Sequence, residues 1–224
     1  MITSDLTDTG LSVEAIRREL TGTTIGRLLH VYGVIDSTTE RLAHLARAGA
    51  PDGTVVIADA QTGARGRAGA PWFSPPGLNL HVSVLFRRPL GITATPVFAF
   101  IAPLAVVDAA EELGLHAVIK GPNDVLVDGK KVAGARVECA MRGGAVDYVI
   151  LGVGVNLNVT PDELHTALGA AGGFASSLGA LTGTVIDRNA FAAAYLRALD
   201  TWAVMYEARG AATVLTAAEI RLVA

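Results

Sequence analysis

The sequence predicts an α+β fold, with a mixed, largely antiparallel sheet flanked by helices. Short apolar or alternating runs typical of strands are spread over the whole chain. Asp128 and Gly129 separate two such runs, and an Asp-Gly pair is typical of the turn in an antiparallel hairpin. Helical segments lie between and after the strands without strict alternation, which argues against an all-parallel sheet.

Size and composition limit the classes of protein that the chain can be. At 224 residues, with 51% hydrophobic and 17% charged residues, it resembles a soluble globular protein with a substantial core. A net charge of −3 provides no general attraction to nucleic acid or to anionic membranes. The longest nearly uninterrupted apolar run, Pro96 to Val107, is too short to span a bilayer.

The N-terminal residues have neither a basic start nor the apolar core of a signal peptide. The single cysteine, Cys139, cannot form an internal disulfide, which fits a reducing compartment. We therefore expect a cytoplasmic protein. Because Cys139 lies within an apolar strand pattern, we expect it to be an inert core residue.

The first elements follow from caps and periodicity. Residues 12–20 are predicted as a short helix and residues 28–35 as a strand. Ser37 is followed three residues later by Glu40, the spacing of a capping box, which predicts a helix that ends near Gly49. A helix N-terminus at this point can be a plain cap, or its unpaired N–H groups can hold a polar ligand.

A Gly-rich loop, residues 61–79, lies between two predicted strands at residues 54–58 and 80–86. The loop carries Arg65 and Arg67 and contains no acidic residue. Glycine lets a backbone approach a ligand closely, and guanidinium matches phosphate or carboxylate with two parallel donors. The loop is therefore a candidate anion clamp, with a plain solvated surface loop as the alternative. The GxxxxGK[ST] phosphate loop is absent.

Two longer helices are predicted in the second half. Residues 96–113 are apolar on most faces and indicate a buried central helix, which Pro103 should kink or divide. The chain is mostly helical from Ser177 onward, and Asp187 is a candidate cap for a helix with one apolar face. That face consists of Phe191, Tyr195, Leu196, Leu199 and Trp202.

The remaining strands are short. Residues 117–120 form one, and residues 125–127 and 131–139 form a hairpin with a type I′ turn between them. Residues 148–158 form a further strand. It contains Gly152 and Gly154, and glycines within a strand suggest the close approach of a ligand or of another backbone.

Three separated blocks together resemble the biotin protein ligases. The first is Asp-Ser-Thr at residues 36–38. The second is QTGARGRAG at residues 61–69, followed by WFSP and GLNL. The third is KGPNDVLVDGKKVAG at residues 120–134, with LGVGVNLN at 151–158. The resemblance implies a catalytic domain of the biotin–lipoate ligase type, similar to class II aminoacyl-tRNA synthetases. We expect it to cover residues 28–224, after an N-terminal extension at 1–27 with a short helix.

The resemblance implies a two-step reaction with biotin, ATP and Mg²⁺. Biotin's carboxylate attacks the α-phosphate of ATP, and a lysine of a biotin carboxyl carrier domain then attacks the resulting biotinyl-AMP. Carboxylate and triphosphate repel each other, so the site must place cations between them. Mg²⁺ is expected on the phosphates, supplied mainly with ATP, and no protein side chain is assigned to it.

The resemblance assigns catalytic roles to four residues. Arg65 and Arg67 would close over the mixed anhydride, on a loop that orders when ligand binds. Lys131 would hold the α-phosphate and the carboxylate oxygen. Asp124 would either orient the incoming lysine or cap the turn after Lys120.

The same resemblance implies the binding residues. Ser37, Thr38 and Gln61 would hydrogen-bond the ureido ring of biotin, and the strand around Gly134 would border its tail. The biotin carboxylate would meet Arg65, Arg67 and Lys131.

For ATP, the resemblance implies that Trp72 packs against adenine and that Asn123 and Asn156 hold the nucleotide. Arg67 and Lys131 would bind its phosphate. A core anchor is the alternative role for Trp72.

The chain departs from the family pattern at several positions. Thr39 stands where asparagine is usual, Ala64 where glycine is usual, Ala70 where an arginine is usual, and Gly121 where tryptophan is usual. If position 64 needs φ > 0, alanine costs on the order of 1 kcal/mol there. We expect neither the helix-turn-helix that precedes the catalytic domain in repressor relatives nor the SH3-like domain that follows it in most relatives.

These departures leave alternatives to a working biotin ligase. One is a relative that binds biotin or biotinyl-AMP without turnover. A lipoate or octanoate ligase is the weaker alternative, because those enzymes lack the Arg-Gly-Arg loop. Relatives occur as monomers and as side-by-side dimers, so the resemblance leaves a homodimer open.

Overall fold

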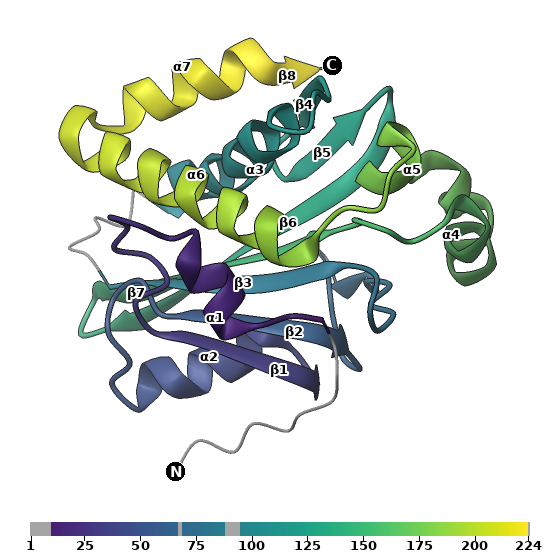
Figure 1. The fold of residues 1–224 in the computed structure, drawn as a ribbon. Coiled ribbons are helices and arrows are strands. Elements are labelled where there is room, and N and C mark those ends of the chain that lie inside the picture. Colours follow the sequence, from purple (N-terminus) through teal and green to yellow (C-terminus); the bar gives the residue numbers. More distant parts are fainter. Residues whose placement is uncertain (1–9, 67–68, 88–94, 224) are drawn as a thin grey trace.

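The computed structural model describes residues 10–66, 69–87 and 95–223. In this part of the chain a mixed sheet forms the centre of the molecule, with helices on both of its faces (Figure 1). Five of the pairings between neighbouring strands are antiparallel and two are parallel. The predicted α+β fold with a largely antiparallel sheet is confirmed.

The strand order is β1-β2-β3-β7-β6-β5-β4-β8. The parallel pairs are β1 with β2 and β4 with β8. The strands are β1 Leu29–Ile35, β2 Val55–Gln61, β3 Leu80–Phe86, β4 Ala117–Lys120, β5 Asp124–Val127, β6 Lys130–Arg142, β7 Ala145–Val155 and β8 Leu222–Val223. The short edge strand β8 was not predicted, because its two residues pair with β4 about a hundred positions away and carry no strand pattern of their own.

The helices are α1 Val13–Arg18, α2 Thr38–Arg47, α3 Thr95–Glu111, α4 Pro161–Leu168, η3 Gly169–Phe174, α5 Leu178–Thr182, α6 Arg188–Arg209 and α7 Ala211–Arg221. The caps predicted at Ser37 and Asp187 are confirmed, and Ser12 caps the helix predicted at residues 12–20. The side chains of Ser12, Ser37 and Asp187 accept hydrogen bonds from backbone N–H groups in the first turns of α1, α2 and α6. The predicted apolar face of α6 is buried, as expected.

Helix α3 runs unbroken through Pro103, so Pro103 does not divide it. Proline removes one backbone donor and crowds the preceding turn, at a cost of about 3 kcal/mol in an isolated helix. Its neighbours Ala102 and Leu104 are completely buried, and α3 packs against both α6 and the sheet. Tertiary packing on several sides therefore maintains the helix.

The β5–β6 hairpin has the predicted turn. Asp128 and Gly129 have φ values of 51° and 74°, and a type I′ turn requires positive φ at both central residues.

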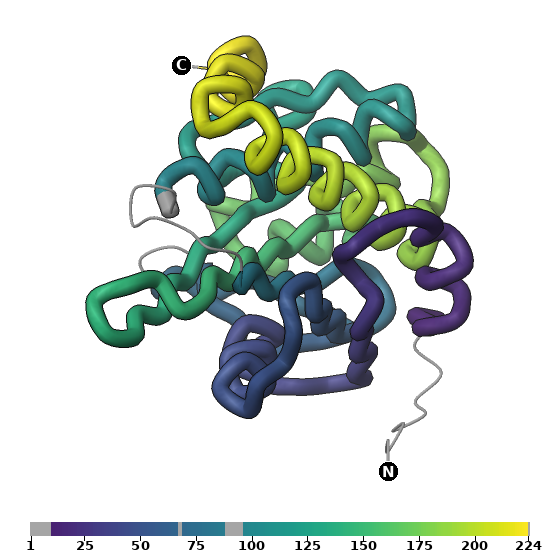
Figure 2. The backbone as a smooth tube through the Cα atoms, turned by 90° about the vertical axis from the view of Figure 1, so that its left-hand side faces the viewer, coloured from purple at the N-terminus to yellow at the C-terminus, as the bar shows by residue number. Residues whose placement is uncertain are grey.

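The prediction of a buried Cys139 is wrong, because its side chain is exposed. Cys139 lies on the same face of β6 as Val137, which packs against the main core. The hairpin of β6 and β7 extends beyond the helices and projects from the body of the molecule (Figure 2). The apolar strand pattern continues into this projecting part, but the hydrophobic core does not. Cys139 is therefore exposed although it follows the pattern of a core residue.

The two faces of the sheet are covered unequally. Helices α3, α6 and α7 lie over one face and enclose the main core (Figure 1). On the other face, α2 packs on a smaller cluster that includes Tyr148 and Ile150 of β7. Side chains alternate along a strand, so Gly152 and Gly154 follow on this second face. The small apolar cluster thus ends where the glycines begin. At the glycines no side chain of β7 covers this face of the sheet, so other segments can approach it.

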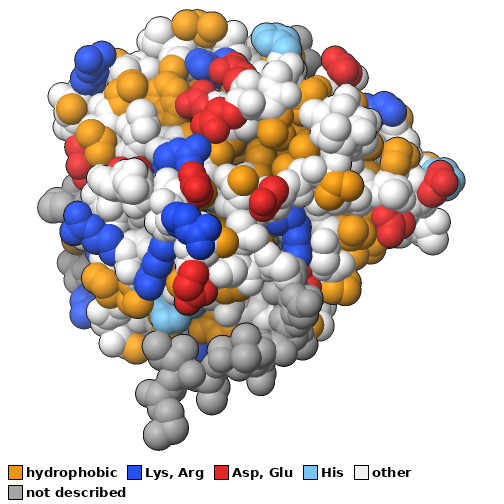
Figure 3. All heavy atoms as spheres, in the orientation of Figure 1, with side chains coloured by type: hydrophobic (Ala, Val, Ile, Leu, Met, Phe, Trp, Pro, Cys, Tyr) orange, Lys and Arg blue, Asp and Glu red, His pale blue; other side chains and the backbone are white. Residues whose placement is uncertain are grey.

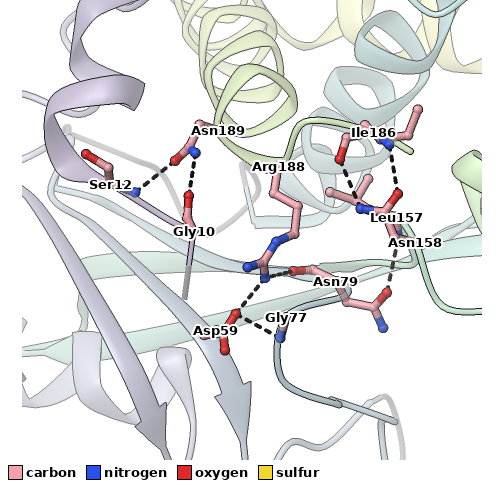
Figure 4. A network of polar contacts seen from close by, with 10 residues as sticks. All are labelled: Gly10, Ser12, Asp59, Gly77, Asn79, Leu157, Asn158, Ile186, Arg188 and Asn189. Atoms are coloured by element: carbon pink, nitrogen blue, oxygen red, sulfur yellow. Dashed lines mark hydrogen bonds and ion pairs between the residues drawn. The ribbon is translucent and has the colours of Figure 1, made fainter. Parts of the chain in front are cut away.

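A buried ion pair connects α6 to the sheet and to the end of the Gly-rich loop (Figure 4). Arg188 Nη1 lies 2.6 Å from Asp59 Oδ1 and also donates to the carbonyl of Asn79. Asp59 Oδ1 also accepts a hydrogen bond from the backbone N–H of Gly77 at 3.0 Å. The pair therefore fixes the C-terminal end of the loop against β2. Sequence reasoning did not predict it, since its partners are 129 positions apart.

Ile16 and Ile25, which precede β1, belong to the main core. The division into an extension at 1–27 and a catalytic domain at 28–224 stays a prediction. Charged side chains of both signs are intermixed on the face seen in Figure 3. Of the helices in the described ranges, none is long and apolar enough to cross a membrane.

His81 of β3 should make stability depend on pH. It is completely buried, and neither imidazole nitrogen has a hydrogen-bond partner in the described part of the chain. Burial, and secondarily the charge of Arg188, lower the pKa of His81 to about 3. Between pH 6.5 and 3 the unfolded chain binds this proton and the folded chain does not. The His81 contribution is therefore complete above pH 6.5 and falls by about 1.4 kcal/mol per pH unit below it.

His81→Leu should remove this dependence. Urea unfolding at pH 7 and pH 5 should show a smaller loss of stability on acidification for the variant than for the original protein. The exposed His116 provides the control, since His116→Leu should retain the original difference. Equal pH dependence in His81→Leu and the original protein would contradict the assignment.

Candidate functional site

A cavity of about 250 Å³ lies on the α2 face of the sheet. Its walls come from the N-terminus of α2, from the Gly-rich loop and from strands β5, β6 and β7. The predicted site residues on it are Ser37, Thr38, Gln61, Arg65, Trp72, Asn123, Asp124, Lys131 and Gly134. The fold thus brings together three blocks that are far apart in the sequence.

A hydrogen-bonded group of side chains forms one end of the cavity. Gln61 Oε1 accepts from the backbone N–H of Thr38 at 2.8 Å and lies 3.2 Å from Thr38 Oγ1. Ser83 Oγ donates to Thr38 Oγ1 at 2.9 Å and lies 3.1 Å from Thr39 Oγ1. The polar groups of this end are therefore held in fixed orientations by one another, and Ser37 lies beside them as the cap of α2.

The side chain of Thr39, one of the departures from the family pattern, packs against the backbone of β7 at Gly152. A Cβ atom at Gly152 would lie 2.6 Å from Thr39 Oγ1, which is too close for any side chain. The prediction that a ligand or another backbone approaches Gly152 closely is wrong, because the side chain of Thr39 makes the closest approach.

Trp72 makes the corresponding approach at Gly154. A Cβ atom at Gly154 would lie 2.5 Å from Trp72 Cε2, and one at Gly134 would lie 3.2 Å from Trp72 Cζ3. The indole thus rests on two strands at positions without side chains. Its Nε1 is buried and has no hydrogen-bond partner among the described residues.

The charged end of the cavity contains Lys131 and Asp124. Lys131 Nζ lies 2.7 Å from Asp124 Oδ1, and Asn123 Nδ2 donates to the same oxygen at 2.9 Å. The ammonium also lies 5.6 Å from the centre of the Trp72 ring. Both members of the ion pair are partly exposed to solvent, so an incoming anion can compete with Asp124 for Lys131.

Of the two loop arginines, Arg67 lies outside the described residues. Arg65 lines the cavity with an exposed side chain, and its Nη1 donates to the carbonyl of Gly69 at 3.4 Å. Ala64 and Ala70 also line the cavity. Ala64 is not among the described residues with positive φ, so the backbone cost considered for alanine at this position does not arise.

A second cavity, of about 360 Å³, adjoins the first and shares Pro71, Trp72, Asp124 and Lys131 with it. Helix α4 contributes Leu164 and Leu168 to it, η3 contributes Ala171 and Phe174, and Asn156 also lines it. Asn156 is buried, and its Nδ2 donates to the carbonyl of Ser176. The two asparagines predicted for the nucleotide therefore do not lie on one cavity, since Asn123 lines only the first.

Gly121, where the family usually has tryptophan, lies against β8. A Cβ atom at Gly121 would lie 3.2 Å from Leu222 Cδ2, so Leu222 occupies part of the adjacent space.

Sequence reasoning missed Arg136, which lines the first cavity from β6. The sequence could have indicated this position, because Arg136 follows Gly134 on the same face of a predicted strand. Nowhere in the described ranges do three or more His, Cys, Asp or Glu side chains gather closely enough to hold a metal ion.

The sequence profile of the biotin/lipoate A/B protein ligase family matches residues 31–156, more than half of the chain. The protein belongs to this family, as the three blocks indicated.

Among its relatives, the bifunctional ligase/repressor BirA of Bacillus subtilis is 36% identical over 179 residues, which cover 80% of this chain and 54% of BirA. This chain therefore spans about half the length of that relative. The biotin–[acetyl-CoA-carboxylase] ligase of Paracoccus denitrificans is 34% identical over 188 residues, which cover 81% of this chain and 75% of that protein.

Among solved structures, the biotin protein ligase of Aquifex aeolicus in complex with biotin and ATP matches with a TM-score of 0.73 at 26% identity. The match covers 88% of this chain and 79% of that one.

Gly154→Ala should displace Trp72, because the new Cβ atom would lie 2.5 Å from Cε2 of the indole. We expect a loss of stability of about 1–3 kcal/mol and greater quenching of tryptophan emission by acrylamide. Gly173→Ala is the control, since nothing lies within 4 Å of its Cβ position. Combining Trp72→Ala with Gly154→Ala should remove most of the added cost. If Gly154→Ala and Gly173→Ala have the same stability and emission, Trp72 does not rest on Gly154.

Proposed function

We propose that this protein is an ATP-dependent biotin protein ligase. It would activate biotin to biotinyl-5′-AMP and transfer the biotinyl group to a lysine of a biotin carboxyl carrier domain. The observation that carries the proposal is one cavity with an orientated polar end at Thr38 and Gln61 and a cationic end at Lys131. The relative named as a biotin–[acetyl-CoA-carboxylase] ligase supports it.

Biotin has a polar ureido ring at one end and a carboxylate at the other, and the cavity offers complementary groups in that order. The ureido group presents N–H donors and a carbonyl acceptor, and the hydroxyl groups of Ser37 and Thr38 and the amide of Gln61 supply both kinds of partner. The tail would then pass along Gly134, beside Lys131 and Trp72. This direction places the carboxylate at the charged end.

In the first step a carboxylate oxygen of biotin would attack the α-phosphorus of ATP. The bond from that phosphorus to the bridging oxygen would break, and pyrophosphate would leave. Lys131, which contacts Asp124 in the structure, would turn part of this contact toward the two anions. Its positive charge would lower the repulsion between them. Arg65 and Arg67 are proposed to add positive charge from the loop.

In the second step the amine of the acceptor lysine would attack the acyl carbon of biotinyl-AMP. AMP would leave with the electrons of the broken acyl–oxygen bond, and the amine would lose a proton. Asp124 is proposed to orient the incoming lysine, because its carboxylate already holds an ammonium group at 2.7 Å, that of Lys131.

ATP would occupy the second cavity with its adenine against Trp72, and its phosphates would extend toward Lys131. Asn123 and Asn156 are proposed to border the nucleotide from the two sides. Mg²⁺ would neutralise the phosphate charge when bound. Because no group of three or more His, Cys, Asp or Glu side chains in the described ranges could hold it, we propose that the ion is held mainly by the phosphates themselves. A cytoplasmic location and a homodimer stay predictions.

The reaction can be tested by mass spectrometry. The protein, biotin, MgATP and an apo carrier domain are mixed, and the carrier should gain the mass of one biotinyl group. Pyrophosphate release should depend on biotin, and lipoate should not compete. Tight biotin binding without adenylate would instead indicate a binding protein that lacks turnover, and competition by lipoate would indicate a different acid substrate. Neither outcome is compatible with the proposal.

Lys131→Ala should slow biotin adenylation by about two to three powers of ten, the usual effect of losing one such electrostatic contact. Lys130→Ala provides a matched control, because Lys130 is the exposed neighbour on the same hairpin and does not line the cavity. Biotin-dependent pyrophosphate release reports the rate. Equal rates for the two variants would show that Lys131 has no part in the first step.

A further inference from the structure

Arg136 is a cationic side chain of the cavity that belongs to none of the three sequence blocks. Its Nη1 donates to the backbone carbonyl of Arg65 at 3.5 Å, and its Nη2 lies 2.9 Å from Glu138 Oε1. The guanidinium therefore lies between the sheet and the Gly-rich loop. One of its terminal nitrogens contacts the loop and the other contacts Glu138 of β6.

The strand geometry explains why the side chain reaches the loop. Residue 136 pairs with Gly152 on β7, and Gly134 precedes it on the same face, so neither position offers a side chain that would crowd it. Glu138 follows on the same face, and its carboxylate contacts Nη2 of Arg136. A planar guanidinium can donate to a carbonyl and a carboxylate at once, whereas a lysine ammonium is a single point charge.

The contact with Arg65 differs from the other hydrogen bonds between described residues within the loop segment 64–72. Gly66 N–H donates to the carbonyl of Ala70, and Trp72 N–H donates to that of Ala64, so both bonds connect the loop to itself. The bond from Arg136 crosses from the loop to β6. It connects the Arg65 peptide to the floor of the cavity.

We propose that Arg136 is a positioning residue that ties the Arg65 peptide of the Gly-rich loop to the sheet. Ala64, Arg65 and Gly66 form a wall of the cavity, so this tie sets the shape of the site that biotin enters. The effect on biotin rests on the proposed function, while the tie itself does not. Losing the tie should weaken biotin binding and leave the chemical groups at Lys131 in place.

Limited trypsin digestion tests the tie without any ligand. The bond after Arg65 is the peptide whose carbonyl Arg136 holds, so its cleavage requires that the contact be released. In Arg136→Met this bond should be cut about five- to tenfold faster, as expected for a partly exposed contact to a charged donor. Mass spectrometry of the full chain identifies the cut, and cleavage rates elsewhere report any general unfolding.

Two further variants sharpen the test. Arg142→Met is the matched control, because Arg142 lies on the same strand, pairs with Asp147 at 3.1 Å and does not line the cavity. Its rate of cleavage after Arg65 should equal that of the original protein. Arg136→Lys keeps the charge and most of the aliphatic chain but loses the planar guanidinium that makes both contacts. It should therefore be cut nearly as fast as Arg136→Met. Should Arg136→Met not fold, Arg136→Lys decides alone.

Adenylation kinetics provide the second measurement. Arg136→Met should raise KM for biotin about tenfold and change kcat by less than about twofold, which a general loss of structure would not do. Unchanged cleavage after Arg65, full protection in Arg136→Lys, or a loss confined to kcat would each overturn the proposal. If the original protein fails to adenylate biotin, the proposed function fails, but the trypsin result still decides whether Arg136 ties the loop.

Discussion

The site depends on the absence of side chains at Gly134, Gly152 and Gly154. A Cβ atom would lie 2.6 Å from Thr39 at Gly152 and 2.5 Å from Trp72 at Gly154, and one at Gly134 would lie 3.2 Å from Trp72. Two elements can therefore rest directly on the strands: the N-terminus of α2 and the loop that carries Trp72. A larger residue at Gly152 or Gly154 would therefore displace Thr39 or Trp72, and with it part of the cavity wall.

The unequal covering of the sheet makes this arrangement possible. One face is committed to the main core under α3 and α6, and its burial supplies most of the hydrophobic stabilisation. The opposite face is apolar only under α2, and its strands change from large side chains to glycine along β7. The core and the site thus share the same strands without competing for the same positions.

Charge within the cavity is balanced by partners that a ligand can replace. Lys131 contacts Asp124, and Arg136 contacts Glu138, and all four side chains are partly exposed. The deeply buried pair of Asp59 and Arg188 is different, since it holds the end of the Gly-rich loop against β2 and is shielded from solvent. Removing one partner of such a pair leaves an uncompensated buried charge, so this contact serves anchoring rather than exchange.

The sequence by itself determined the elements whose cause is local. Caps such as Ser37, the turn at Asp128 and Gly129, and the bounds of β3 each depend on a few neighbouring residues, and the structure agrees with them. The three blocks also indicated the family and most residues of the cavity. Only the tertiary structure decided the pairing of β8, the exposure of Cys139, and the partners of Arg136 and Arg188. Those features depend on which distant segments pack together, and a local pattern carries no information about a partner a hundred residues away.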